Sequence, residues 1–267
     1  MNIDRAVFNR TRLLVGDDGM SRLSEAKVII LGVGGVGSWC AEALIRSGVR
    51  HLTIVDSDRV CVTNINRQLM ANISTVGKVK VEALKEQLLL INPSAQIETR
   101  QAIFCQETAD SFNLPDYDYI VDCIDSLKDK ILLILMATRT KARFYSSMGA
   151  ALKMDPTRIK VAEFWKVQGC PLARMIRKRM KGMKRFPSKK FKCVFSDEVL
   201  ENKGRNEACG TGACMCPKSK ATNEDSPLHN HEWCSSKAQI NGTMMHITAM
   251  FGLILGGLVI EDILKES

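Results

Sequence analysis

We expect neither a signal peptide nor a membrane-spanning segment in this sequence. Residues 1–12 are polar and charged, so they do not resemble a signal peptide and we expect a cytoplasmic protein. One apolar run near the end, residues 247–260, would make roughly 21 Å of helix, whereas a bilayer core is ~30 Å thick. We therefore expect this run to be a buried helix or a subunit interface, and we expect no membrane partner.

Paired Cys-x-x-Cys motifs are also absent, although the chain has ten cysteines. In a reducing cytosol, burial or metal binding is favoured over disulfides. The irregular stretch 201–236, rich in cysteine, glycine and asparagine, contains Cys209-x4-Cys214-x-Cys216 and later Cys234. This spacing is not that of a standard zinc finger. Three interpretations stay open: a zinc site, buried or partly oxidised thiols, and a loop that sets substrate specificity.

Acidic residues are missing from residues 172–192, which carry ten lysines and arginines. The net charge of +9 is therefore concentrated in this block, and the rest of the chain is close to neutral. A local basic block favours a polyanionic partner, and the nucleotide site described next favours RNA over DNA or a membrane. The alternative is a solvated helix face that binds nothing.

The stretch 27–58 contains the clearest motif in the chain. It reads as a buried strand at 27–31, a turn with the pattern Gly32-x-Gly34-x-x-Gly37, a helix at 38–47, and a second strand at 52–55 that ends on Asp56. In such a unit the helix N-terminus offers N–H groups to phosphate, and the carboxylate accepts a ribose hydroxyl. The pattern predicts nucleotide binding, with a purely structural glycine turn as the alternative.

Strands and helices alternate up to Gly149, and the alternation then fades. We expect a helix within 76–93, a strand at 96–102, a short helix at 107–112, a strand at 119–124, a helix at 127–141 and a strand at 143–148. Later elements are a strand at 159–165, a basic helix at 171–184, a strand at 192–195 and an apolar closing helix within 239–265. The order predicts an α/β fold with a doubly wound, mainly parallel sheet, whose ligands bind at the carboxyl ends of the strands.

Cations that follow the second strand favour an adenylating site over a dehydrogenase, which has no obvious use for them. Arg67, within Asn66-Arg67-Gln68, and Lys80, expected one turn into the next helix, together would neutralise a triphosphate as pyrophosphate leaves. Asp125 follows a later strand and would hold magnesium, which prefers oxygen ligands. Each has a plain alternative: a surface ion pair for Arg67, a solvated position for Lys80 and a helix N-cap for Asp125.

The motifs GVGGVG, IVDSDRV, TNINRQ, VGKVKVE and VDCIDS resemble the ubiquitin-activating-like superfamily of adenylating enzymes over residues 8–165. The resemblance implies ATP and magnesium as cofactors and a Rossmann-like adenylating fold. It also implies a homodimer in which Arg10, within the motif FNR, reaches the partner's ATP. Arg10, Arg67, Lys80 and Asp125 would be catalytic. The implied nucleotide-binding set is Gly32, Gly34, Gly35, Gly37, Asp56, Asp58, Asn64, Asn66, Arg67, Gln68, Lys80, Asp122 and Asp125.

Within that superfamily, VGSWCAEALIRSG, VCVTNINRQ, VDCIDSLKDK, CPLARMIRKRM and CVFS resemble the tRNA threonylcarbamoyladenosine dehydratases. The resemblance implies ATP-dependent activation of the threonyl carboxylate of a modified adenosine beside the tRNA anticodon. Ring closure within the nucleoside would then release AMP. Because the nucleophile belongs to the substrate, this chemistry needs orientation and charge stabilisation but no catalytic thiol.

Two other functions stay open at this stage. A sulfur-carrier-protein adenylyltransferase would act on a protein C-terminus, which does not call for the basic block, and a non-catalytic nucleotide-dependent binding module would not need Arg67, Lys80 and Asp125. A sulfur-relay partner and a monovalent ion at the dimer are also left open. We expect one domain over residues 1–267, with a nucleotide-binding core at 8–165 and a substrate and dimer extension at 166–267.

Overall fold

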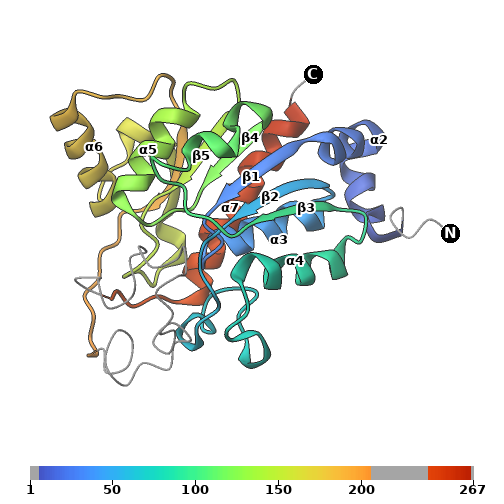
Figure 1. The fold of residues 1–267 in the computed structure, drawn as a ribbon, viewed down its shortest axis with the longest axis horizontal. Coiled ribbons are helices and arrows are strands. Elements are labelled where there is room, and N and C mark those ends of the chain that lie inside the picture. The colour runs from blue at the N-terminus through green and yellow to red at the C-terminus, as the bar shows by residue number, and fades with distance from the viewer. Residues whose placement is uncertain (1–5, 206–239, 266–267) are drawn as a thin grey trace.

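A computed structural model describes residues 6–205 and 240–265, and it contains one seven-stranded sheet (Figure 1). The strand order is β3-β2-β1-β4-β5-β7-β6, and every neighbouring pair is parallel except β6 with β7. This order confirms the doubly wound, mainly parallel α/β fold. The strands are β1 (Lys27–Leu31), β2 (His51–Val55), β3 (Gln96–Arg100), β4 (Tyr119–Asp122), β5 (Arg143–Ser147), β6 (Ile159–Glu163) and β7 (Lys192–Ser196).

Helices cover both faces of the sheet because successive strand residues point to opposite sides. Val28 and Ile30 of β1 join the hydrophobic core under α3, α4 and α7, whereas Ile29 and Leu31 join the core under α5 and α6. The helices are α2 (Asn9–Glu25), α3 (Gly37–Ser47), α4 (Lys80–Ile91), α5 (Leu127–Ala137), α6 (Pro171–Met183) and α7 (Met245–Lys265). Short 3-10 turns, η1 (Val62–Asn64) and η2 (Ile73–Thr75), lie in the loop after β2.

One of the elements beyond residue 165, β7, is part of the main sheet. β7 lies between β5 and β6, so strands from both sides of residue 165 belong to one sheet, and the division into a core at 8–165 and an extension at 166–267 stays a prediction. The expected helix at 107–112 is shorter and forms the 3-10 turn η3 (Ala109–Phe112). The expected strand at 159–165 ends early, because the Glu163 carboxylate accepts a hydrogen bond from the Trp165 N–H and begins a 3-10 turn.

The closing helix α7 packs closely against α3. A Cβ atom at Gly252 would lie 2.3 Å from the Val36 carbonyl oxygen, and one at Gly256 would lie 2.8 Å from Ala43 Cβ, so glycine lets the two helices approach. By length and composition α7 could cross a membrane, with a mean hydropathy of 1.9 over its most apolar window. Half of that window is buried within the chain, however, as in the core helix of a folded domain.

Candidate nucleotide-binding site

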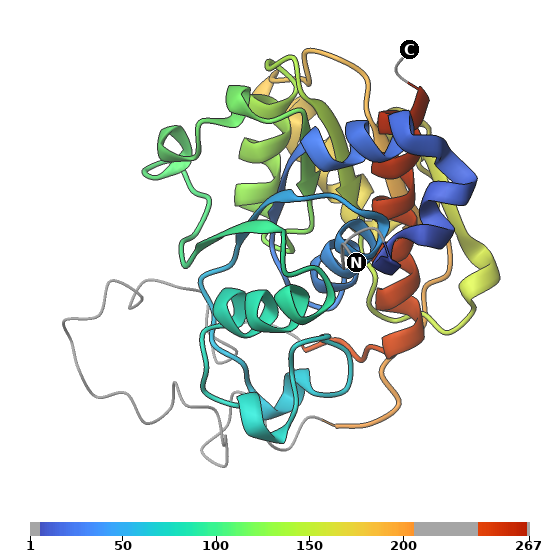
Figure 2. The ribbon, with the colours of Figure 1, turned by 90° about the vertical axis from the view of Figure 1, so that its right-hand side faces the viewer.

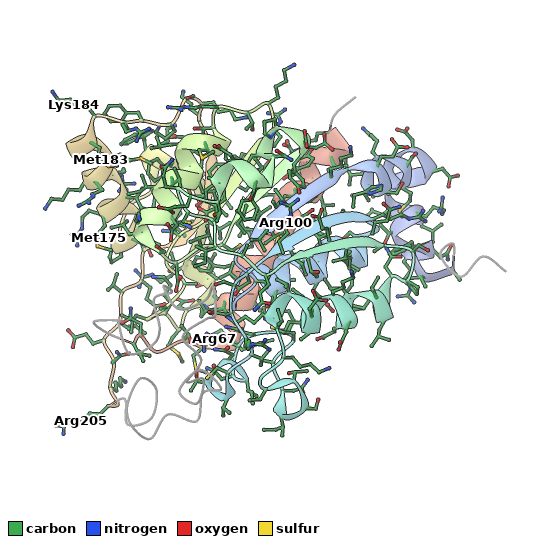
Figure 3. All side chains as sticks on the ribbon, viewed as in Figure 1. Arg67, Arg100, Met175, Met183, Lys184 and Arg205 are labelled. Carbon is green, nitrogen blue, oxygen red and sulfur yellow. The ribbon has the colours of Figure 1, made fainter. Side chains whose placement is uncertain are left out.

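The carboxyl ends of β1, β2 and β4 bring almost all the predicted nucleotide-binding residues to one edge of the sheet (Figure 1). Gly32 to Gly37 follow β1, Asp56 to Gln68 follow β2, and Asp122 and Asp125 end or follow β4. Lys80 is the first residue of α4 rather than a full turn into it. Figure 3 shows Arg67 at this edge, beneath the ends of the strands.

The glycine-rich turn is so tight that side chains would not fit at two of its positions. Gly32 has φ +88°, and a Cβ atom there would lie 2.7 Å from the Cys123 carbonyl oxygen. At Gly37 a Cβ atom would lie 1.9 Å from the carbonyl oxygen of Gly32. No side chain caps the N-terminus of α3, where Val36 is the N-cap residue. The turn therefore presents backbone N–H groups of the kind that bind phosphate.

Asp56 fastens the glycine-rich turn to the end of β2. Its Oδ2 accepts a hydrogen bond from the Val33 N–H at 3.0 Å, and its Oδ1 accepts one from the Asp58 N–H at 2.9 Å. The side chain is only 12% exposed. The carboxylate is thus held rigidly beside the turn, as a ribose acceptor must be, and ribose binding stays a prediction.

Lys80 is buried between two carboxylates. Its Nζ lies 2.9 Å from Asp58 Oδ2 and 3.6 Å from Asp56 Oδ1. Burial alone would lower the pKa of Lys80, but the negative charges of Asp56, Asp58 and Asp125 outweigh it and raise the pKa above its ordinary value. Lys80 therefore stays protonated at every physiological pH, and a solvated helix position is excluded.

Arg67 is positioned by hydrogen bonds on both sides of its loop. Its Nη1 donates to the Thr63 carbonyl at 2.8 Å and to Asn66 Oδ1 at 2.9 Å, while the Arg67 carbonyl accepts from Trp39 Nε1 on α3 at 3.0 Å. Gln68 is buried beside Gly34, and its Oε1 accepts no hydrogen bond within the described residues. The Gln68 atom nearest the turn is the amide nitrogen Nε2, which lies 3.7 Å from the position of a Cβ atom at Gly34. The buried acceptor on the same amide suits a hydroxyl of a bound nucleotide.

Two predicted ligands hold the scaffold of the site. The Oδ1 atom of buried Asn64 accepts a hydrogen bond from the Cys61 N–H and closes η1, so Asn64 fixes the loop, and its contact with the nucleotide stays a prediction. Asp122 is fully buried, and its carboxylate lies 2.8 Å from Lys130 Nζ and accepts from Ser146 Oγ at 2.6 Å. With no exposed surface, Asp122 cannot contact a nucleotide, and the prediction for it is corrected.

Lys130, which the sequence analysis missed, links this pair to the loop that holds Asp125. Its Nζ also donates to the Ile124 carbonyl at 2.8 Å, and the Ile124 N–H donates to Asp122 Oδ1. Lys130 belongs to the motif VDCIDSLKDK and lies among Ile131, Leu133 and Ile134 on the buried face of α5, which is the pattern that could have revealed it.

Asp125 is exposed in the loop between β4 and α5. The N-cap of α5 is Ser126, so the capping role considered for Asp125 is excluded. Its negative charge acts on Lys80 and contributes to the raised pKa of that residue. In the described part of the chain no three His, Cys, Asp or Glu side chains converge on a metal position. Magnesium would therefore be held by Asp125 and by phosphate oxygens, an arrangement that this ion commonly adopts.

The remaining candidates lie away from this edge. Arg10 is near the start of α2, where neighbouring Phe8 packs near Gly48 at the opposite, amino-terminal edge of the strands. Cys209, Cys214, Cys216 and Cys234 lie outside the described residues. Cys170 and Cys193 are buried, and burial raises the pKa of the Cys193 thiol well above its ordinary value.

Comparison with known proteins agrees with this geometry over almost the whole chain. Residues 8–265 match the ThiF family. The chain belongs to the ThiF family. The tRNA threonylcarbamoyladenosine dehydratase of Bacillus subtilis is 35% identical to it over 265 residues, which cover 97% of this chain and 95% of the relative.

Two solved structures resemble this ThiF family member in fold and in length. They are the Escherichia coli tRNA N6-threonylcarbamoyladenosine dehydratase in complex with ATP (TM-score 0.78, 28% identity) and in complex with AMP (TM-score 0.79, 29% identity). Each comparison covers 98% of this chain and 96% of the other. The superfamily resemblance noted in the sequence is thus confirmed.

The buried pair of Asp122 and Lys130 gives a first prediction. In Lys130→Met the Asp122 charge would be left buried without its partner, so the free energy of unfolding should fall by about 3–5 kcal/mol. Lys128→Met is the matched control, because Lys128 is exposed on the same helix and should change stability by less than about 0.5 kcal/mol. Urea unfolding measures both. Equal midpoints for the two variants would contradict the importance of the pair.

Proposed function

We propose that this chain is an ATP-dependent tRNA threonylcarbamoyladenosine dehydratase. The observation that carries the proposal is the 35% identity to a dehydratase of that name over nearly the full length of both chains. The site supports it independently, because a glycine-rich turn, an uncapped helix N-terminus and two cations lie at one edge of the sheet. The sulfur-carrier alternative would match the nucleotide half alone and leave α6 unexplained.

When bound, ATP supplies the activating group for the substrate carboxylate, and ring closure within the nucleoside releases AMP. The turn from Gly32 to Gly37 would bind the phosphates through backbone N–H groups. Arg67 would stabilise the charge that develops as pyrophosphate leaves, and Asp125 would hold magnesium on the phosphates. Asp56 would accept a ribose hydroxyl and fix the distance between sugar and turn.

Within the described residues, the burial of Cys170 and Cys193 supports ring closure without an enzyme thioester. Cys170 and Cys193 have almost no exposed surface, and burial raises the pKa of Cys193, so neither is poised as a nucleophile. A sulfur-transfer reaction would require an exposed thiol of low pKa. A zinc site, a monovalent ion, a sulfur-relay partner and a cytoplasmic location stay predictions.

The direct test is nucleoside analysis of tRNA incubated with the protein and ATP. The wild type should convert threonylcarbamoyladenosine to its cyclic form. Arg67→Ala and Lys80→Ala should each lower turnover by about a hundredfold, which corresponds to ~3 kcal/mol of transition-state stabilisation. Lys78→Ala is the control, because Lys78 is an exposed neighbour paired with Glu86.

Stability must be measured alongside turnover, since Lys80 is buried and its loss leaves Asp56 and Asp58 without their cation. A folded Arg67→Ala or Lys80→Ala variant with turnover near that of the wild type would contradict the role of that residue. Absence of the cyclic product with the wild type would overturn the proposed function itself.

Helix α6 supports a polyanionic substrate. Ala173, Ile176 and Met180 face the core, and the opposite side carries Arg174, Lys178, Arg179 and Lys181. No ion pair joins these four cations to an acidic side chain within the described residues. Figure 3 shows α6 at one side of the molecule, with Lys184 at its outer end. Arg177 differs from the rest, because it donates to the Phe164 carbonyl and lies over the Phe164 ring.

Reversing the charge of Lys178 and Lys181 to Glu should weaken tRNA binding and lower the salt slope by about one unit for each phosphate that the helix no longer neutralises. ATP affinity should not change, because the nucleotide residues lie on other elements. The control is Lys27→Glu with Lys85→Glu, which changes the net charge equally on a distant part of the chain. The measurement is tRNA affinity at several salt concentrations. Equal salt slopes for the two double variants would show that α6 is a solvated helix face that does not bind tRNA.

A homodimer is part of the proposal, and an exposed apolar face supports it. Leu13 and Leu14 of α2 are 80% and 87% exposed, and Met250 and Leu253 of neighbouring α7 are also exposed. Figure 2 shows α2 beside α7. Arg10 precedes Leu13 and Leu14 by three and four residues and therefore shares their face of the helix. Because Arg10 lies at the far edge of its own sheet, it would serve the site of the other subunit.

Mixing two inactive variants tests this arrangement. Arg10→Ala and Lys80→Ala should each be inactive alone, whereas a re-equilibrated mixture should recover roughly a quarter of wild-type activity. In a mixed dimer, one site has its own Lys80 and receives Arg10 from the other subunit. No recovery, although mass measurement shows mixed dimers, would contradict the contribution of Arg10 in trans.

A further inference from the structure

Three segments that are far apart in sequence are bound into one unit beside the candidate nucleotide site. They are residues 150–155 after β5, residues 197–203 after β7, and residues 240–246 before and within the start of α7. The Leu152 N–H donates to the Gly242 carbonyl at 2.9 Å, and the Leu200 N–H donates to the Leu152 carbonyl at 3.0 Å. The Asn202 side chain bonds to both Ile240 and Gly242.

Polar groups fix the geometry of this junction through hydrogen bonds within the protein. The Glu198 carboxylate accepts the N–H groups of Met154 and Asp155 at 2.8 and 3.0 Å. These bonds lower the pKa of Glu198, so the carboxylate stays ionised and the bonds persist well below neutral pH. Leu152 has φ +58°, a left-handed conformation that is uncommon for leucine. Its backbone bonds to the two other segments hold it there.

The junction is continuous with the nucleotide-binding loops. Asn66, next to Arg67, donates from Nδ2 to the Thr243 carbonyl at 3.1 Å. A Cβ atom at Gly35 would lie 3.2 Å from both Thr248 Cβ and Arg67 Cγ, so the first turn of α7 packs on the glycine-rich turn. Residues 243–248 therefore connect the phosphate-binding edge to the ends of β5 and β7.

The junction carries an exposed apolar surface in spite of this polar scaffold. We call it the methionine platform; it consists of Met154, Val199, Leu200, Met244 and Met245. Met154, Met244 and Met245 are 51%, 46% and 41% exposed. Methionine adapts to flat aromatic groups and makes favourable contacts between sulfur and rings. Such a surface beside the candidate phosphate site suits a ligand with both an apolar, flat group and a group that reacts at the phosphates.

We propose that the methionine platform binds the base of the substrate nucleoside. This inference rests on the proposed function, in which the activated carboxylate and the base belong to one nucleoside and are only a few bonds apart. The base must therefore lie next to the phosphate site, and the platform is continuous with that site through Thr243 and Thr248. The negative charge of the tRNA backbone agrees with this position, because basic α6 begins near the junction. Leu172 at the start of α6 adjoins Gly149, which follows β5 and precedes the first junction segment.

His246 supplies a polar contact at the edge of the platform. Its Nε2 donates to the Met154 carbonyl at 2.9 Å, which fixes the ring. The other ring nitrogen, Nδ1, makes no hydrogen bond within residues 6–205 and 240–265. In the neutral ring this nitrogen is an acceptor, so it suits an N–H group of the base or of its side chain.

The first experiment uses an anticodon stem–loop that carries threonylcarbamoyladenosine, so that most contacts to the tRNA body are absent. Met154→Gln with Met245→Gln keeps side-chain length but adds polar groups, and it should raise the KM for this RNA at least tenfold. His246→Ala should raise the same KM. The KM for ATP and the unfolding midpoint should not change. Leu90→Gln is the control, because Leu90 is 86% exposed on α4 and remote from the platform.

The second experiment maps contact directly by mild peroxide oxidation of methionine. The modified stem–loop should protect Met154, Met244 and Met245 of the wild type, whereas Met250 of α7, which lies in the proposed dimer contact, should oxidise at a rate that RNA does not change. An unchanged KM for the stem–loop in the double variant would overturn the proposal that the platform binds the base. Equal oxidation of the platform methionines with and without RNA would overturn it as well. In either case cyclic product from wild-type protein would leave the proposed function intact, so the two failures are distinguishable.

Discussion

The buried charge cluster of Lys80, Asp56 and Asp58 is the interaction on which the rest of the site depends. It joins the end of β2 to the start of α4, and Asp56 extends it to the glycine-rich turn through the Val33 N–H. The cluster carries two negative charges and one positive charge, so by itself it does not attract phosphate. In the proposed function this attraction comes from Arg67, from the N-terminus of α3 and from the magnesium that Asp125 would hold. We therefore infer that Lys80 acts on phosphate only if it turns partly away from its carboxylates.

The sequence was informative where functional residues are contiguous. Gly32, Asp56, Arg67 and Lys80 could be placed at one edge because each follows or begins an element with a clear period, and parallel strands end at the same edge. The sequence was less informative about contacts between distant elements. Thr243 and His246 come from the approach to α7 and from α7 itself, and nothing local marks them. Lys130 has only a weak local signal, its place on the apolar face of α5, and its partner Asp122 comes from another element. The helix α2 was not predicted, because a non-helical Gly16 with φ +73° interrupts its pattern.

Asp122 shows why an acidic residue at a strand end is ambiguous. An acidic side chain at this position can bind a ligand if it faces the crevice. If it faces a helix, it forms structural contacts within the protein instead. Here Lys130 arrives from α5 and the Ser146 hydroxyl from β5, and they complete the shell of the Asp122 carboxylate inside the protein. The pair keeps the loop after β4 in place through the Ile124 carbonyl, so Asp125 is positioned by a charge that the ligand never meets.

The chain that follows β5 supplies the second half of the proposed site, the half beside the glycine-rich turn. Because β7 pairs with β5 and α7 returns to pack on α3, residues 243–248 lie between the ends of the strands and the glycine-rich turn. The proposed nucleotide edge and the proposed substrate edge thus meet along one short segment, in which the Thr243 carbonyl accepts a hydrogen bond from Asn66 and His246 bonds to Met154. A reaction that joins a carboxylate to a phosphate within one complex requires such a meeting, since the two groups must be held within bonding distance before either reacts.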